Sequence, residues 1–207
     1  MDNALTLYYS PGACSLSPHI ALREAELPFA LVRVDLAKKQ TETGEDFRKI
    51  NPNGYVPCLQ LTDGRTLTEG PAIVQYIADQ VPEKGLAPAN GTWERYQLQQ
   101  WLNFISTEIH KSYSPLFKPN TSQDHKNFAR DLLTTRLEYV AHELAHRPYL
   151  LGERYSVADI YLFVTLSWAP YVALDLTKWP SLTQYQTRVG SRPAVQAALR
   201  AEGLIKS

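Results

Sequence analysis

Hydrophobic and polar residues in the first eighty positions follow the short period of strands, interrupted by helical stretches. Strands are expected at residues 5–9, 29–34, 56–61 and 65–67, and helices at 18–25, at 45–50 and from the cap Thr68 onward. The last two strand runs flank Asp63-Gly64, and Asp-Gly between β runs is a strong hairpin signal. This order predicts an α/β domain in which helices pack against a mixed sheet.

The pattern changes after residue 81. The next ten residues contain Pro82, Gly85 and Pro88, which is typical of an interdomain linker. Beyond them strand signals disappear, and helices are expected at 93–112, 124–146, 156–168, 180–189 and 193–201. The sequence therefore predicts an α/β domain over 1–81, a linker over 82–91 and an all-helical domain over 92–207.

Composition and charge narrow the class of protein. Hydrophobic residues make up 44% and charged residues 20% of the 207 residues, and 21 basic side chains balance 21 acidic ones. Net charge therefore gives no reason to expect nucleic acid or an anionic membrane as a partner. The apolar stretch 160–174 is too short and too interrupted to span a bilayer. The start lacks a secretory signal pattern, and two cysteines do not make a disulfide framework, so a cytoplasmic protein is expected.

Cys14 is the first residue that can do chemistry. It lies in a tight turn between a strand and a helix, where the helix dipole and unpaired N–H groups are expected to lower its pKa and favour the thiolate. Ser17 occupies the position three residues later, so this is not a Cys-x-x-Cys dithiol. Cys14 can form a mixed disulfide or hydrogen-bond another thiol. The alternative is a small buried residue that fills a gap.

Two segments near the predicted hairpin are suited to binding a peptide. Val56-Pro57 opens a strand, and a cis bond there would leave the backbone of Val56 free to pair with an extended ligand, whereas an ordinary trans proline would not. Thr68-Glu69-Gly70 leads into a helix, where backbone N–H groups favour a carboxylate and the Glu69 side chain favours an ammonium. Simple helix capping is the alternative for this second segment.

The predicted helix over 93–112 carries two stripes. At about 100° per residue, the apolar stripe consists of Leu98, Leu102, Ile105 and Ile109. A polar stripe about 120° away consists of Asn103, Thr107 and His110. Such a stripe faces solvent or a cleft, and the ordinary pKa of His110 suits a hydrogen-bond partner or proton acceptor for a thiol.

Other motifs are expected to be structural. His142 to His146 matches the H-E-x-x-H zinc spacing, but the sequence offers no third ligand at the expected distance, so no metal is predicted. Ser156 and Asp159 have capping-box spacing, and loss of Asp159 is expected to cost about 0.5–2 kcal/mol. Cys58, on a sheet strand, is expected to be buried and inert.

Several motifs occur together in a fixed order. They are Tyr8-Tyr9-Ser10-Pro11-Gly12-Ala13-Cys14-Ser15, Asn53-Gly54-Tyr55-Val56-Pro57, Thr68-Glu69-Gly70-Pro71-Ala72-Ile73 and Gly152-Glu153-Arg154-Tyr155-Ser156-Val157-Ala158-Asp159. The arrangement resembles the glutathione transferase superfamily over nearly the whole chain. The cysteine at the first helix resembles the bacterial, cysteine-containing (beta-class) branch. This resemblance implies a thioredoxin-like glutathione-binding domain over 1–81 and an electrophile pocket in the helical domain.

The resemblance also implies how glutathione is held. Val56 is expected to pair with the cysteinyl backbone through a cis Pro57, Glu69 and Gly70 to hold the γ-glutamyl end, and Lys39 to hold the glycyl carboxylate. Many relatives carry Ser after the Glu, whereas Gly70 offers only its backbone N–H, so one hydroxyl contact is expected to be missing.

The remaining expectations concern the helical half. His110, with Asn103 and Thr107, resembles the residues that close over the glutathione sulfur, and Cys14 and His110 are the expected catalytic residues. If Cys14 is a redox residue and another group activates the glutathione thiol, the nearby hydroxyl candidates are Tyr8, Tyr9 and Ser15. A hydrophobic pocket is expected to involve Tyr113, Phe117 and Trp168. We also expect a homodimer, with Asn103 extending to the partner's ligand.

The predicted activity is conjugation of glutathione to hydrophobic electrophiles, with disulfide exchange at Cys14 as a further option. The alternative is a carrier of glutathione and hydrophobic ligands with little turnover.

Overall fold

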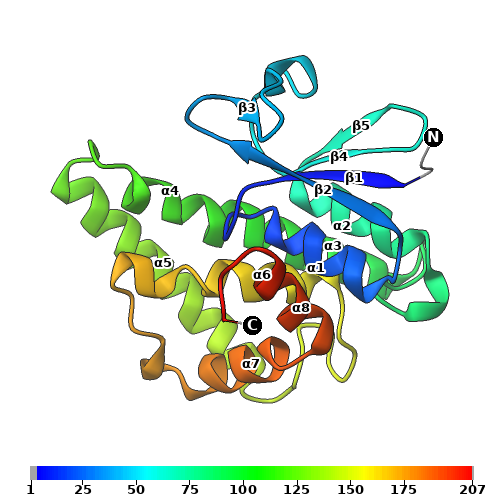
Figure 1. Cartoon of the computed structure of the whole chain (residues 1–207). Helices are drawn as coiled ribbons and strands as arrows, with labels where there is room; N and C mark the ends of the chain where they lie inside the picture. Colours follow the sequence, from blue (N-terminus) through cyan, green and yellow to red (C-terminus); the bar gives the residue numbers. More distant parts are fainter. Residues whose placement is uncertain (1–3, 207) are drawn as a thin grey trace. The chain divides into compact units, whose positions relative to one another are not determined.

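A computed structural model describes residues 4–206, so the outer ends of both predicted domains, at residues 1 and 207, lie outside the described range. The chain forms two compact units (Figure 1). The first extends to Ala87 and takes up the chain again from Arg192, and the second covers Pro88–Ser191. The predicted linker begins just before the end of the first unit. The last helix, which the sequence analysis assigned to the helical domain, packs in the first unit.

A five-stranded mixed sheet forms the centre of the first unit. Its order is β3-β2-β1-β4-β5. The strands are β1 (Leu5–Tyr9), β2 (Phe29–Asp35), β3 (Gln40–Thr41), β4 (Cys58–Gln60) and β5 (Thr66–Thr68). Strands β1 and β2 are parallel and the other neighbours are antiparallel. The predicted hairpin is confirmed, because β4 and β5 pair across the Asp63-Gly64 turn, with Gly64 at a φ of 87°. The two-residue strand β3 was not predicted.

Alternation along β1 directs side chains to the two faces of the sheet. Tyr8 packs on one face with Val34, Phe47 and Cys58. Phe47 belongs to the 3₁₀ helix η1 (Phe47–Lys49), which occurs where a short helix was predicted over 45–50. Leu7, the neighbour of Tyr8 in the strand, is fully buried and points to the opposite face. Figure 1 shows helices α1 and α2 on one side of the sheet.

Helices α1 (Leu16–Glu24) and α2 (Gly70–Asp79) begin close to the predicted positions. Ser15 is the N-cap residue of α1, one position after Cys14. The N-cap residue of α2 is Glu69, with a φ of 67°, and not Thr68 as predicted. Thr68 instead pairs with Cys58 in the sheet. Sheet pairing has thus extended one residue further than the local sequence indicated.

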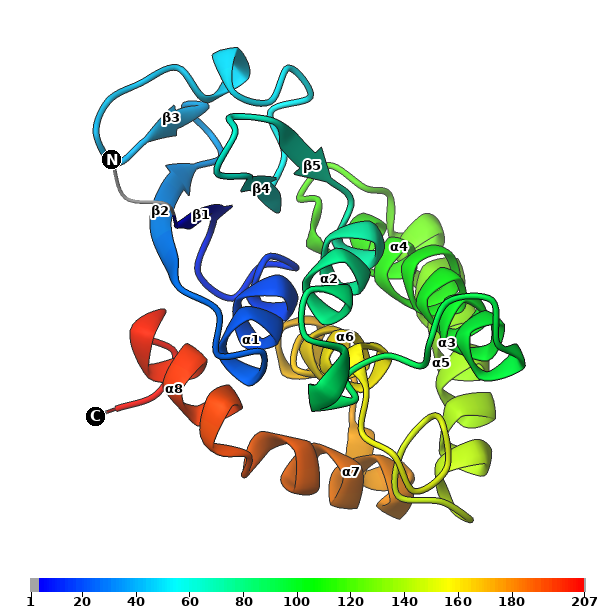
Figure 2. The same cartoon turned by 90° about the vertical axis from the view of Figure 1, so that its right-hand side faces the viewer.

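Helix α8 (Pro193–Ala201) lies beside α1 in Figures 1 and 2. Arg192 donates two hydrogen bonds to the carboxylate of Glu24, at 2.6 and 2.9 Å. The end of the chain is held to the first unit by these charges and by the buried contacts of Glu202 described below.

The second unit is built from helices, as predicted. They are α3 (Trp93–Phe104), α4 (Lys111–Phe117), α5 (Gln123–Leu144), α6 (Val157–Leu166) and α7 (Pro180–Gly190). Short 3₁₀ segments are η2 (Pro82–Lys84) in the first unit and η4 (Ala169–Val172) and η5 (Leu176–Lys178) in the second. The predicted apolar stripe is confirmed, because Leu98, Leu102, Ile105 and Ile109 are at most 1% exposed.

A π-helical segment, η3 (Ile105–His110), separates α3 from α4. The sequence analysis predicted an unbroken α-helix here. Insertion of a wider turn changes the angle between successive side chains, and such segments are frequent at functional sites. His110 is the last residue of this segment.

The predicted capping box at the start of α6 is confirmed. The side chain of Asp159 is fully buried and accepts hydrogen bonds from the backbone of Leu150 and Ser156 and from the hydroxyls of Ser156 and Tyr185, at 2.9 to 3.1 Å. Burial raises its pKa to about 6, although these hydrogen bonds act in the opposite direction. Asp159 thus joins α6 to α7 as well as capping a helix.

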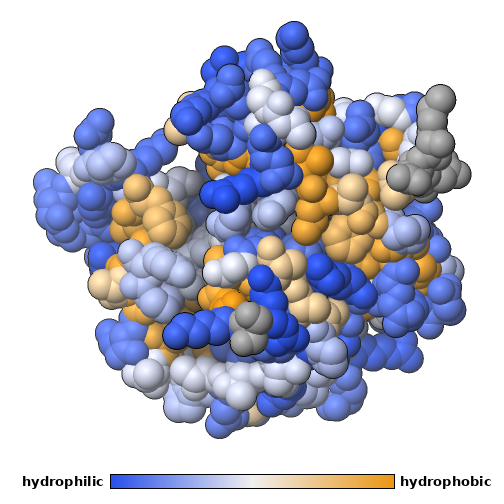
Figure 3. Space-filling model, in the orientation of Figure 1, coloured by the Kyte–Doolittle hydropathy of each residue, from blue (hydrophilic) through white to orange (hydrophobic). Residues whose placement is uncertain are grey.

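The visible surface carries both polar and hydrophobic residues. On the face drawn in Figure 3, hydrophobic residues lie in separate areas between polar ones. Over residues 4–206, no helix combines the length and the apolar character that a bilayer crossing requires.

Candidate functional site

Cys14 lies in the turn between β1 and α1. Its Sγ donates a hydrogen bond to the carbonyl of Val56 at 3.4 Å. Burial raises the pKa of Cys14 to about 11; Glu69 also raises it, while the backbone N–H groups of Cys14 and Ser15 lower it. The predicted lowering of this pKa is therefore wrong, because removal from water outweighs the N–H groups at the helix terminus. Cys14 is a protonated thiol at neutral pH.

The peptide bond between Val56 and Pro57 is cis. Of the two states that the sequence left open, the structure adopts the one that the family resemblance implied. Val56 precedes β4 and lies outside the paired part of that strand. Within residues 4–206, its N–H donates no hydrogen bond. The backbone N–H of Val56 is thus available to a ligand beside the Cys14 thiol.

The turn that leads into α2 lies next to this proline. Glu69 has a left-handed backbone and an exposed side chain. A Cβ placed on Gly70 would lie 3.9 Å from Cγ of Pro57 and 4.0 Å from Oγ of Ser17. The Ser17 hydroxyl, which donates to the carbonyl of Cys14 at 3.0 Å, thus lies near the position that a side chain at residue 70 would occupy.

Lys39 is half-buried and anchored to the loop before Val56. Its Nζ donates to the carbonyl of Gly54 at 2.9 Å and lies 5.1 Å from the centre of the Tyr55 ring. A left-handed backbone at both Lys39 and Gly54 makes this close approach possible. The ammonium group could bind a ligand carboxylate if it exchanged its present acceptor, the Gly54 carbonyl, for that group.

Cys14, Val56, Pro57, Glu69 and Gly70 are thus brought together within the first unit. The hydroxyls of Tyr8 and Ser15, which are alternatives to Cys14 as activators of the thiol, have other partners. Tyr8 donates to the side chain of Gln60 at 3.2 Å, and burial raises its pKa. The Ser15 hydroxyl bonds the backbone of Ser10.

His110 belongs to the helical unit, where it contacts two aromatic residues. Its Nδ1 lies 2.7 Å from the hydroxyl of Tyr161, and its ring centre lies 4.8 Å from that of Trp168. Burial and, to a smaller extent, the charge of Lys111 lower the pKa of His110 to about 4. The imidazole is neutral at pH 7 and too weak a base to deprotonate a thiol, so of the two predicted roles only hydrogen bonding fits.

Asn103 and Thr107 do not share the surroundings of His110. Both are exposed, and the hydroxyl of Thr107 donates to the carbonyl of Asn103 at 3.0 Å. Asn103 lies in α3, before the π-helical segment that contains Thr107 and His110. The wider turn of this segment changes the angle between successive side chains, which explains why the predicted polar stripe divides.

Three aromatic rings extend the surroundings of His110. Tyr113 lies 5.5 Å from Trp168 and 6.0 Å from Phe117, measured between ring centres. Among residues 4–206, no group forms a hydrogen bond with the buried hydroxyl of Tyr113. Of the three rings, Phe117 is exposed and the other two are buried, so the cluster presents apolar ring surface to a ligand.

The glutamate of the H-E-x-x-H sequence has another partner. Glu143 makes an ion pair with Arg147, and the His142 side chain is largely exposed. Over residues 4–206, no group of three or more metal-ligating side chains is assembled.

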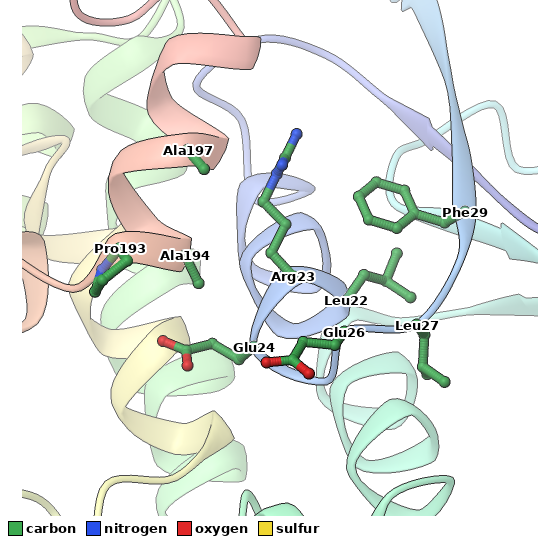
Figure 4. A pocket seen from close by; sticks show the side chains of 9 residues that line it. All are labelled: Leu22, Arg23, Glu24, Glu26, Leu27, Phe29, Pro193, Ala194 and Ala197. Carbon is green, nitrogen blue, oxygen red and sulfur yellow. The ribbon is translucent and has the colours of Figure 1, made fainter.

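A groove lies elsewhere on the first unit, between α1, β2 and α8 (Figure 4). Its volume is about 580 Å³, and Arg23, Glu24, Phe29 and Ala197 are among its lining residues. Figure 4 shows Arg23 extending from α1 into the space between Phe29 and α8. The guanidinium lies 5.6 Å from the centre of the Phe29 ring.

A thiol beside a cis proline in a thioredoxin-like sheet, with a separate helical unit, defines a class of proteins that handle thiols. The N-terminal domain model of the glutathione S-transferase family matches residues 12–80, and the C-terminal domain model matches residues 104–193. The chain is 47% identical over 201 residues to the glutathione S-transferase GstA of Escherichia coli O157:H7, which covers 97% of this chain and all of that protein.

Solved structures agree. The chain resembles BphK, a bacterial glutathione transferase solved as a ternary complex, with 70% identity and a TM-score of 0.95 over 96% of this chain and 99% of that one. A sphingomonad glutathione S-transferase complexed with glutathione is 52% identical, with a TM-score of 0.94 over 97% of this chain and all of that one. The chain belongs to the glutathione S-transferase family, and the predicted family, fold class and glutathione transferase activity are confirmed.

Proposed function

We propose that the first unit binds reduced glutathione in an extended form and that Cys14 donates a hydrogen bond to its sulfur. In this proposal the N–H of Val56 pairs with the cysteinyl residue, Glu69 and Gly70 take the γ-glutamyl end, and Lys39 exchanges Gly54 for the glycyl carboxylate. The observation that carries the proposal is the contact between the Cys14 thiol and the Val56 carbonyl, beside a backbone N–H without a partner.

The chemical role of Cys14 follows from its protonation state. A thiol with a pKa of about 11 is a hydrogen-bond donor at neutral pH and a poor nucleophile. A donor directed at the glutathione sulfur stabilises the thiolate that attacks an electrophile. Of the two roles left open for Cys14, we therefore favour thiol donor over mixed-disulfide former.

His110 contributes a second neutral donor in this proposal, and the rings of Tyr113, Phe117 and Trp168 bind the hydrophobic electrophile. Asn103 and Thr107 remain predicted contacts of glutathione. The homodimer and the cytoplasmic location also remain predictions. The electrophile chemistry that fits best is a flat aromatic group, because the rings of Tyr113, Phe117 and Trp168 pack against one another there.

The test compares Cys14→Ser with Cys14→Ala in conjugation of glutathione to an aryl halide and in reduction of a mixed disulfide. A donor role predicts that Cys14→Ser keeps most of the conjugation and that Cys14→Ala loses about tenfold, the worth of one hydrogen bond to a charged group. If the wild type reduces disulfides and both variants lose that activity while conjugation is unchanged, Cys14 is a redox residue instead. Glutathione binding without conjugation in the wild type would favour the carrier.

A further inference from the structure

A buried chain of polar groups connects the end of the protein to the turn that carries Cys14. The carboxylate of Glu202, which follows α8, accepts a hydrogen bond from the backbone N–H of Gly12 at 2.9 Å. Its other oxygen lies 2.8 Å from Nδ1 of His19 on α1. The side chains of His19 and Glu202 are both fully buried. Arg23 completes the chain by donating from Nε to Nε2 of His19 at 2.9 Å.

The groups on either side of His19 determine which of its ring nitrogens carries the proton. A carboxylate only accepts hydrogen bonds, and an arginine Nε–H only donates them. His19 therefore fits between Glu202 and Arg23 only as the neutral tautomer with its proton on Nδ1. The order of donors runs in one direction, from Arg23 through His19 to Glu202, and the Gly12 N–H meets the same carboxylate from the other side.

The residue that receives this carboxylate lies two positions before Cys14. Gly12 has a φ of 70°, and a Cβ there would lie 3.3 Å from Cδ2 of Leu204. The turn closes with a hydrogen bond from the N–H of Ala13 to the carbonyl of Ser10 at 3.1 Å. A left-handed glycine in a short turn is free to adopt other conformations unless an outside contact holds it.

We propose that Glu202 is a positioning residue for Cys14. Its carboxylate fixes the turn at residues 10–13 and so holds the Cys14 thiol against the carbonyl of Val56. The role of this placement in catalysis rests on the proposed function, whereas the placement itself does not. Glu202→Gln keeps the size of the side chain but directs an NH₂ group at either the Gly12 N–H or the His19 Nδ1–H, so one donor faces another.

Alkylation of Cys14 by iodoacetamide, followed by mass spectrometry, measures how often the turn opens. Losing one charge-assisted hydrogen bond raises the open population about tenfold or more, and the alkylation rate follows that population when reclosure is fast. Cys58 is the internal control, because it is fully buried in the same unit and reacts only through wider unfolding. Faster alkylation of Cys14 with unchanged Cys58 is the expected result for Glu202→Gln.

Glu24→Gln is the matched control. It removes the other charged link between α1 and α8, the ion pair with Arg192, and does not touch the turn. We expect Glu24→Gln to lower the melting temperature and leave the Cys14 rate unchanged. Equal Cys14 rates in Glu202→Gln and Glu24→Gln would overturn the proposal and leave Glu202 as an anchor for α8.

The wild type supplies a test that needs no folded variant. Amide hydrogen exchange of Gly12 is expected to be as slow as that of core amides, because its N–H is held by a buried carboxylate. Exchange of Gly12 at the rate of an exposed loop would overturn the proposal even if Glu202→Gln fails to fold. Both readouts work without glutathione, so a failure of the proposed function is seen separately, in the KM for glutathione.

Discussion

Gly70→Ser is a substitution that the structure accommodates and that tests how the γ-glutamyl end is bound. Gly70 is the first residue of α2, and a Cβ there would meet only Pro57 and Ser17, at 3.9 and 4.0 Å. Both distances are ordinary van der Waals contacts, so the serine fits without displacing either neighbour. Its hydroxyl would supply the contact that many relatives are expected to make.

Two effects of Gly70→Ser differ in size. Replacing glycine in the first turn of a helix stabilises the fold by about 0.5 kcal/mol at most, a shift in melting temperature of roughly 1–2 °C for a chain of this length. A hydroxyl that bonds a carboxylate contributes about 1 kcal/mol net when the water that it replaces is counted. The Kd for glutathione is therefore expected to fall about fivefold.

Calorimetric titration with S-methylglutathione measures this Kd without interference from thiol oxidation. Gly70→Ala is the matched control, because it carries the same gain in helix propensity and no hydroxyl. We expect Gly70→Ser to bind more tightly than Gly70→Ala, and Gly70→Ala to bind like the wild type. Equal affinities for the two variants would refute the assignment of the γ-glutamyl carboxylate to this turn.

Four further predictions concern titratable groups. Asp159→Ala is expected to cost about 3–5 kcal/mol in urea unfolding, because it leaves several buried donors without an acceptor; a loss below 2 kcal/mol would mean that Asp159 is only a helix cap. Because the folded-state pKa of Asp159, about 6, lies above the unfolded value, the free energy of unfolding relative to Asp159→Asn is expected to fall as the pH rises from about 4 to about 6; a rise would contradict this sign. Alkylation of Cys14 is expected to increase with pH up to about 11, and a plateau near pH 8.5, the ordinary thiol pKa, would show that the thiol is not buried. The His110 ring, with its pKa of about 4, is expected to show no NMR titration between about pH 5.5 and 8, and a midpoint near 6.5 would contradict its burial.

Local sequence patterns were sufficient for most of the fold. The hairpin, the helices of the second half and the capping box at Ser156 each depend on residues close together in the chain, and each was predicted. The errors lie where distant residues compete with local preference. Thr68 resembles a helix cap, but pairing with Cys58 in the sheet retains it as a strand residue. The π-helical segment that ends at His110 gives no signal in the period of hydrophobic residues.

The candidate site was predicted in part, for a similar reason. Motif order indicated Cys14, Val56 and Glu69, and the structure brings them together. The sign of the Cys14 pKa shift was not predictable, because it depends on how much water the fold removes. Ser17 and Glu202 were missed entirely. Glu202 lies 190 residues from the backbone group that it binds, and a lone glutamate after a helix gives no signal of that contact.

The return of the chain's end to its first unit affects how the protein can be made and cut. During synthesis the N-terminal half leaves the ribosome first, yet it cannot be completed until the segment from Arg192 onward has followed it. Closing so long a loop late is expected to slow the final step of folding. A gene fragment that stops at Ala87 would lack α8 and would leave the α1 surface bare.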